Sequence, residues 1–251
     1  MSKVIDINKV KVACQECSLA QLCLPAGLNA GDMRRLDDLV EERAIYQRGE
    51  ALYRKGQTMR SIYAVRSGCV KSYIMGDGGE AQIVGFHLPG ELIGLDAIAT
   101  AVYRTTTEAL ESTSVCRVPF DSLEDLSRDL PSLNQHLWRI MSKEISREGD
   151  VLQLLSGKNS AARLASFLLS LSERYRERHL SVSEFNMSMT RHEIGNYLGM
   201  AVETVSRTLT GFHNQSLVNV RGKFVQIIDF AGLHEIAGHP CTTTLDKKQN
   251  A

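Results

Sequence analysis

The sequence lacks a long apolar run. A transmembrane helix needs about 18 consecutive apolar residues, and no stretch of the 251 residues comes near that length. The N-terminal MSKVIDINKV lacks the extended apolar segment of a secretory signal. We therefore expect a soluble, cytoplasmic protein without membrane association. Thiols stay reduced in the cytoplasm, so the six cysteines are expected to be buried thiols, metal ligands or redox groups rather than disulfides.

Net charge of one sign is also lacking. Lys and Arg number 29, as do Asp and Glu, so whole-chain charge does not indicate a nucleic-acid partner. A DNA-binding protein of this composition must concentrate its basic residues locally. In addition, no Gly-x-Gly-x-x-Gly motif follows a predicted strand, which argues against a flavin or nicotinamide enzyme. We expect no catalysis.

Residues 44–118 consist of short apolar pieces separated by glycines. Short strands with turns at this spacing predict an all-β barrel or roll. The glycine-rich turn at 76–79 predicts a hairpin within it. Amphipathic spacing predicts helices over 30–43 and 160–178 on either side of the roll. This mixture predicts an α+β fold.

A long helix is predicted to start at Pro131, since proline suits a first helical position, and to run to about Leu155. Its apolar residues alternate three- and four-residue spacings, as in a two-helix coiled coil. These residues are Trp138, Met141, Ile145, Leu152 and Leu155. The alternative interpretation is a helix that packs on its own domain.

Glu148 interrupts this coiled-coil pattern, at a position where the spacing expects an apolar side chain. In a homodimer, two Glu148 carboxylates would approach and repel each other, and a buried unpaired charge costs several kcal/mol. Such a dimer would be weak unless another part of the molecule stabilised it. This is the expected design of a dimer whose equilibrium can be switched.

The stretch 190–209 has the pattern of a helix-turn-helix. Thr190 and Glu193 form a capping box that predicts the start of the first helix, and Gly199 supplies the turn. The second helix is predicted to begin near Val202 and to place its N-terminal end in the major groove of double-stranded DNA. Its predicted outward face carries Glu203, Thr204, Ser206, Arg207 and Thr208.

The side chains of this outward face suit base edges. Arg207 can bind guanine bidentately, Glu203 can accept from cytosine, and Ser206 can contact either edge. Residues 216–229 read as a two-stranded wing, which together with Arg191 supplies the local positive charge. An ordinary pair of core helices is the alternative.

Three cysteines, Cys14, Cys17 and Cys23, lie close together near the N-terminus. Scattered structural thiols are one interpretation, and a four-cysteine zinc site is another. A zinc finger fits poorly, because no second Cys-x-x-Cys and no histidine at finger spacing is present. An iron–sulfur cluster also needs four thiolates and often takes one from far along the chain. Spacing leaves the fourth ligand open among Cys69, Cys116 and Cys241.

Together these motifs resemble the FNR branch of the CRP/FNR regulators, over nearly the whole chain. The specific pieces are the cysteine run ending in Leu-Cys-Leu-Pro, AVRSG, FHLPGELIGLDAI, ALESTSVCRVPF and MTRHEIGNYLGMAVETVSR. The resemblance implies an oxygen-sensing transcription factor with a 4Fe–4S cluster, and it selects Cys116 as the fourth ligand. Cluster binding would favour the dimer. Oxygen would convert the cluster to 2Fe–2S, with loss of dimerisation and DNA binding.

The resemblance also implies a DNA target and a role. The target is a palindrome of the type TTGAT-N4-ATCAA, read by Glu203, Ser206 and Arg207, and two-fold symmetry of a dimer independently requires a palindrome. The protein would activate or repress genes of anaerobic metabolism and contact RNA polymerase, with the turn at Gly76–Glu80 as a candidate surface. The family usually carries Asp at the position of Glu148.

Within the same superfamily, a cyclic-nucleotide sensor is the rival interpretation. Gly90-Glu91 and Arg104-Thr105 faintly resemble the ribose- and phosphate-binding residues of that pocket. We interpret them as a relic of the fold, because the cysteine run would otherwise have no purpose. A bound cyclic nucleotide is therefore not expected.

The resulting expectation is an α+β chain with five segments. They are a cluster-binding segment at 1–28, a sensory domain of the cyclic-nucleotide-binding β-roll type at 29–130, a dimerisation helix at 131–157, a winged helix-turn-helix domain at 158–237 and a flexible tail at 238–251.

Overall fold

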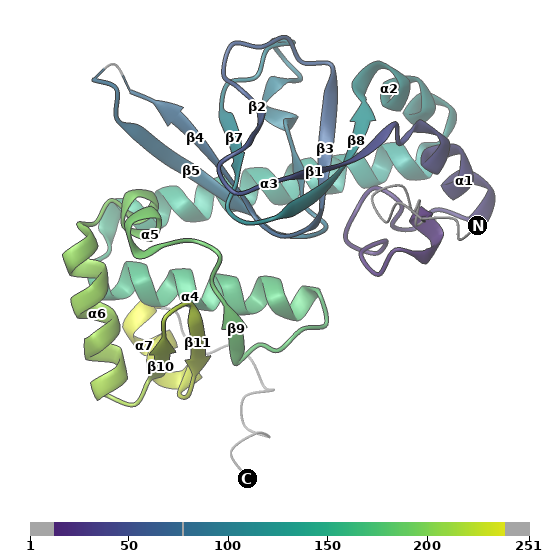
Figure 1. Cartoon of the computed structure of the whole chain (residues 1–251). Helices are drawn as coiled ribbons and strands as arrows, with labels where there is room; N and C mark the ends of the chain where they lie inside the picture. Colours follow the sequence, from purple (N-terminus) through teal and green to yellow (C-terminus); the bar gives the residue numbers. More distant parts are fainter. Residues whose placement is uncertain (1–12, 77, 239–251) are drawn as a thin grey trace, which may run out of the picture. The chain divides into compact units, whose positions relative to one another are not determined.

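The computed structural model describes residues 13–76 and 78–238 (Figure 1). The chain forms two compact units that divide within helix α3 (Pro131–Gly157), between Ile145 and Ser146. The first unit combines a β-roll with helices, and the second contains the predicted helix-turn-helix. The expected α+β class is confirmed.

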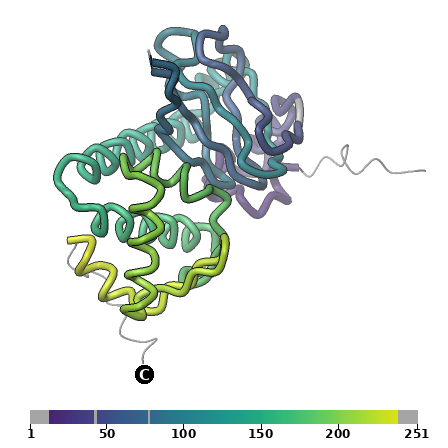
Figure 2. Tube along the Cα trace, turned by 60° about the vertical axis from the view of Figure 1, so that its left-hand side comes forward, coloured from purple at the N-terminus to yellow at the C-terminus, as the bar shows by residue number. Residues whose placement is uncertain are grey.

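The β-roll consists, within the described residues, of two four-stranded antiparallel sheets. One sheet has the order β1-β8-β3-β6 and the other β2-β7-β4-β5. Figure 2 traces this unit in a second view, with the roll in blue and the N-terminal loop in purple. The strands are β1 (Glu42–Tyr46), β2 (Ala51–Tyr53), β3 (Ser61–Ser67), β4 (Val70–Met75), β5 (Ala81–His87), β6 (Leu92–Ile93), β7 (Thr106–Ala109) and β8 (Thr113–Pro119).

The predicted hairpin joins β4 to β5. Its closing bonds run from the Gly76 amide to the Glu80 carbonyl at 2.8 Å and from the Gly79 amide to the Gly76 carbonyl at 3.0 Å. Gly79 has a φ of +85°, which favours glycine at this position. Asp77 lies outside the described residues. The glycines therefore form the expected turn.

Short helices cover one end of the roll in Figure 1: α1 (Ala30–Leu39) and α2 (Phe120–Asp129), followed by α3. The predicted helix at 30–43 was too long. Val40 is buried and ends α1, and residues 42–46 pair in register with β8 instead. Amphipathic spacing continues into this stretch, but the long-range strand pairing outweighs it.

The second unit is built on α4 (Ser160–Glu177), which closely matches the helix predicted at 160–178. Asn159 is the N-cap of α4, and its side chain accepts from the Ala162 amide at 2.9 Å. The remaining elements of this unit are β9 (Glu184–Asn186), α5 (Arg191–Leu198), α6 (Val202–Asn214), β10 (Val218–Arg221), β11 (Phe224–Ile227) and α7 (Phe230–Ala237). The first unit also contains the short 3-10 helix η3 (Leu95–Ala97).

The helix-turn-helix has the local structure that the sequence predicts. Thr190 and Glu193 form the capping box of α5, and Gly199 adopts the left-handed conformation between α5 and α6. The wing strands β10 and β11 pair around the turn at 221–224. The sequence did not reveal β9, which adds a third strand by pairing with β11. No helix within the described ranges has both the length and the apolar character to cross a membrane.

The two helices of this motif meet at Gly195. A Cβ placed there would lie 2.6 Å from the Met200 carbonyl oxygen and 3.4 Å from a Val205 methyl group. The Met200 amide also donates to the Gly195 carbonyl at 2.8 Å. The close approach of α5 and the turn therefore requires glycine at this position.

Gly195→Ala should destabilise the second unit by about 1–3 kcal/mol, because the methyl group overpacks this contact. Calorimetric unfolding of the full chain measures the loss. Gly211→Ala on α6 is the matched control: its Cβ would meet nothing within 4 Å, so alanine should stabilise the helix by up to about 1 kcal/mol. Native stability in Gly195→Ala would contradict the close approach.

Candidate functional site

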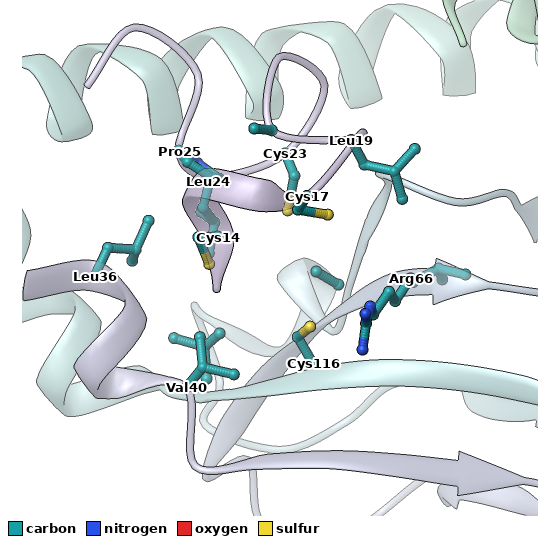
Figure 3. A pocket seen from close by; sticks show the side chains of 14 residues that line it. Cys14, Cys17, Leu19, Cys23, Leu24, Pro25, Leu36, Val40, Arg66 and Cys116 are labelled. Atoms are coloured by element: carbon teal, nitrogen blue, oxygen red, sulfur yellow. The ribbon is translucent and has the colours of Figure 1, made fainter. Parts of the chain in front are cut away.

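Four of the cysteines line one pocket in the first unit (Figure 3). Cys14, Cys17 and Cys23 come from the N-terminal loop, and Cys116 comes from β8 and points toward that loop. The cavity between them measures about 40 Å³. The structure therefore brings together the three clustered cysteines and the cysteine that the family resemblance selected.

Tight turns place the three loop cysteines. Cys14 begins the 3-10 turn η2 (Cys14–Glu16), and the Cys17 amide donates to the Cys14 carbonyl at 3.3 Å. The Cys23 amide donates to the Leu19 carbonyl at 3.1 Å. Leu24, the next residue, is only 2% exposed, so the segment after the last cysteine is anchored in the core. The described part of the predicted cluster-binding segment thus has its own hydrogen bonds and is anchored in the core by Leu24 and Leu28.

Strand alternation explains the position of Cys116. Successive side chains of a strand point to opposite faces, and Cys116 and Val118 both line the pocket while Val115 is fully buried. Cys69 directly precedes β4 and is fully buried, with its sulfur 3.8 Å from the Val70 carbonyl oxygen, and it does not line this pocket. Cys241 lies outside the described residues.

Hydrogen bonds fasten the loop to helices, among them one from Gln15 Nε2 to the Ala30 carbonyl of α1 at 3.0 Å. The Cys14 amide donates to Asp37 Oδ1 on α1 at 3.1 Å, and His136 Nε2 on α3 lies 3.0 Å from the Cys23 carbonyl oxygen. Sequence reasoning missed both Asp37 and His136. Neither has a motif of its own, because each reaches the loop from a distant element.

The pocket changes the acidity of its thiols. Burial raises the pKa of the Cys23 thiol to about 12, and Cys116 and Cys17 contribute in the same direction. Burial raises the pKa of Cys14 still further above its ordinary value, followed by the hydrogen bond and negative charge of Asp37. These thiols are therefore protonated at neutral pH, and a metal that binds them must displace protons.

The rest of the lining is mainly apolar, apart from the guanidinium of Arg66 on β3. It consists of Leu19, Ala20, Leu24, Pro25, Leu36, Val40, Ala64, Val65 and Val118. Within the part of the chain that the structure describes, no three His, Cys, Asp or Glu side chains are grouped closely enough to hold one metal ion. The thiols surround a space with apolar walls and one cation at its edge.

Gly90 and Glu91, which faintly resemble a ribose-binding pair, have structural contacts here. Gly90 has a φ of +91°, and a Cβ on it would lie 3.0 Å from the Leu22 Cβ in the cysteine loop. Glu91 is 8% exposed, and its carboxylate accepts from the Leu88 amide at 3.1 Å. Gly90 thus permits the close approach of the cysteine loop, and Glu91 closes a turn.

The second faint pair, Arg104-Thr105, does not form a phosphate cradle. Arg104 is exposed, and the Thr105 hydroxyl donates to Asp96 at 3.3 Å. Nearby, Tyr53 stacks on Tyr103 with ring centroids 3.9 Å apart, which fills this part of the roll with the chain's own side chains.

The predicted DNA-reading residues share one surface of the second unit. Glu203 and Arg207 on α6 are exposed, and Thr204 and Ser206 are half-buried. Arg191, at the start of α5, reaches the Ser206 hydroxyl at 3.4 Å, and Arg207 reaches the Thr204 hydroxyl at 3.3 Å. The motif thus presents two guanidinium groups, two hydroxyls and a carboxylate together.

Arg163 on α4 joins the turn of this motif to the end of α3. Its guanidinium donates to the Leu198 carbonyl at 3.1 Å and to the Leu155 carbonyl at 2.9 Å, and its Nε donates to the Lys158 carbonyl at 3.0 Å. Cations are favourable near the C-terminal carbonyls of helices. The sequence offered no signal for this residue.

Large apolar side chains are exposed along α3 at seven-residue intervals. Trp138, Ile145 and Leu152 are 64%, 68% and 69% exposed. Met141 and Leu155 are half-buried, and Glu148 is exposed. We call these six residues the α3 stripe. Exposed apolar side chains arranged in this way mark an interaction surface.

Comparisons with known proteins match both units. Residues 43–129 match the cyclic nucleotide-binding domain, and residues 162–236 match the Crp-like helix-turn-helix domain. Among solved structures, FixK2 from Bradyrhizobium japonicum is similar, with a TM-score of 0.72 and 30% identity. The similarity covers 80% of this chain and 98% of that one.

Relatives are similar over almost their whole length. The transcriptional activator protein FnrA of Stutzerimonas stutzeri is 48% identical over 95% of this chain and 98% of its own. The fumarate and nitrate reduction regulatory protein of Escherichia coli is 43% identical over 91% of each chain. These relatives are transcription regulators rather than enzymes, as expected. The chain belongs to the CRP/FNR family of DNA-binding transcription regulators and is of the FNR type.

Proposed function

We propose that this regulator responds to oxygen through a 4Fe–4S cluster held by Cys14, Cys17, Cys23 and Cys116. The observation that carries the proposal is the arrangement of these cysteines, from two distant segments, around one pocket. The relatives named as FNR and FnrA support it. When bound by these four cysteines, the cluster would supply an oxygen-labile link between the loop and the strand.

The donor set and the walls fit such a group. Four thiolates are the ligand set of a 4Fe–4S cluster, in which each thiolate binds a different iron, so the sulfurs need not converge on one point. Apolar walls exclude water, and the guanidinium of Arg66 suits the net negative charge of a thiolate-bound cluster. Zinc would use the same thiols, and iron and sulfide analysis separates the two.

The chain's own residues make the empty and loaded forms distinct. Without metal, the raised pKa values of Cys14 and Cys23 keep those thiols neutral, which suits an apolar pocket. In that form no covalent link joins the loop to Cys116. In the loaded form β8 and the loop are joined, which restricts the loop to one arrangement.

We further propose that the α3 stripe forms a homodimer. Two copies paired along it would bury the exposed Trp138, Ile145 and Leu152 in coiled-coil packing. The same pairing would bring together two Glu148 carboxylates, which repel each other. The dimer is therefore marginal, and a restraint from the loaded cysteine pocket decides whether it forms.

The dimer would read a palindrome of the type TTGAT-N4-ATCAA and activate or repress genes of anaerobic metabolism. Glu203, Ser206 and Arg207 read base edges in each half-site, while Thr204 and Arg191 contact them or the backbone. The turn at 76–80 is the proposed contact with RNA polymerase. The roll binds no cyclic nucleotide in this proposal, since its candidate binding pairs have structural contacts instead.

Cys116→Ser should abolish cluster binding, because serine leaves only three thiolates at the pocket. Anaerobic reconstitution followed by iron and sulfide analysis measures the loss. Cys69→Ser is the matched control: Cys69 is buried away from the pocket, so this variant should load like the native chain. Loss of the cluster in Cys69→Ser with retention in Cys116→Ser would refute the ligand assignment.

Glu148→Ala should give dimers that persist in air, since the carboxylate repulsion is removed. The dimer dissociation constant of the cluster-free chain should fall about tenfold or more, which corresponds to at least about 1.4 kcal/mol. Sedimentation measures it. Asp150→Ala removes the same charge from an exposed position outside the α3 stripe and should change little. A Glu148→Ala chain that is still monomeric in air would contradict this account.

A further inference from the structure

The carbonyl group of Cys23 lies at a junction between the cysteine loop and α3. Its oxygen accepts from the Ala26 amide at 3.1 Å, within the loop. It also lies 3.0 Å from Nε2 of His136, which is 113 residues away in the chain. A carbonyl can only accept, so this nitrogen must carry the hydrogen. The peptide of a proposed cluster ligand is thus bonded directly to the long helix.

His136 lies on the face of α3 that packs against its own unit. Leu133 is fully buried, and Leu137 and Ile140, like Cys23, pack against the core that contains Leu24. His136 precedes Trp138 by two positions, about 200° around the helix, so it faces away from the α3 stripe. One side of α3 therefore contacts the cysteine loop, and the other side carries the exposed apolar residues.

Because a packed helix moves as a rigid body, a shift of the loop face displaces the opposite face as well. Figure 1 shows the N-terminal loop, in purple, beside the end of α3. His136 makes a polar contact between this loop and α3. The peptide of Cys23 can hold that end of the helix only while the loop itself is held.

We propose that His136 is a positioning residue that couples the state of the cysteine loop to dimerisation. With the loop restrained, the Cys23 carbonyl stays within reach of His136 and holds α3 in the position in which the α3 stripe can pair. With the loop released, the hydrogen bond is lost and α3 is no longer held. This inference rests on the proposed function, since it takes the cluster as the restraint.

The test compares the dimer dissociation constants of cluster-loaded and cluster-free chains by anaerobic sedimentation. His136→Leu removes the donor, and it should load the cluster normally but dimerise about fivefold more weakly in the loaded form, the effect of one hydrogen bond. Its cluster-free constant should not change. His136→Gln, which keeps an N–H within reach, should retain most of the native coupling.

Lys143→Leu is the matched control, because Lys143 lies seven residues further on the same face of α3 and is exposed. It should dimerise like the native chain in both forms. Coupling is the ratio of the cluster-free to the cluster-loaded dimer dissociation constant, and His136→Leu should lower this ratio about fivefold. A purely structural role would weaken dimerisation of the loaded and cluster-free forms equally, so the ratio of their dissociation constants would not change.

The proposed role would be overturned if the loaded native chain and loaded His136→Leu had equal dimer dissociation constants. It would also be overturned if His136→Leu weakened dimerisation of the loaded and cluster-free forms equally. A His136→Leu chain that folds but takes up no cluster would overturn it as well. If His136→Leu does not fold, His136→Asn is used in its place, because its amide is too short to reach Cys23. It is then compared with His136→Gln. A native chain that binds no iron, or does not dimerise on loading, would instead refute the proposed function.

Discussion

The arrangement of four thiols around one small pocket is the constraint on which the rest of the molecule depends. Three of them belong to a short loop that buries Leu24 and Leu28 after its last cysteine, and the fourth belongs to a strand in a well-packed sheet. A segment this short buries little apolar area compared with a domain. Bonds from four sulfurs to one bound group would fix the position of the loop. Four neutral thiols that share no bound group would not fix it.

Helix α3 lies between this constraint and the partner subunit that we propose. Its inner face contacts the cysteine loop through His136 and shares the core around Leu133. Its outer face carries exposed apolar residues interrupted by the Glu148 carboxylate. Marginal pairing of this kind suits a switch, because a change of a few kcal/mol at the cysteines moves the equilibrium by orders of magnitude. At the other end of α3, Arg163 bonds the last turn to the helix-turn-helix.

Local signals made much of this structure predictable. The capping box at Thr190 and the glycine at Gly199 depend only on neighbours, so the sequence located both helices of the motif correctly. The helix predicted at 30–43 extended too far, because pairing of residues 42–46 with β8 is a long-range effect. The choice of Cys116 over Cys69 depends on which side chains of the roll are turned to the loop. The spacing of the cysteines along the sequence carries no information about this. His136 had no signal, since it meets the loop only in the folded chain.

The most direct test of the central claim measures cluster content and oligomeric state on the same native sample, before and after exposure to air. Anaerobic protein should contain about four irons and four sulfides per chain and sediment as a dimer that binds the palindrome. After air exposure the iron content should fall and the dimer should dissociate. A chain without iron, or a dimer indifferent to loss of the cluster, would contradict the account.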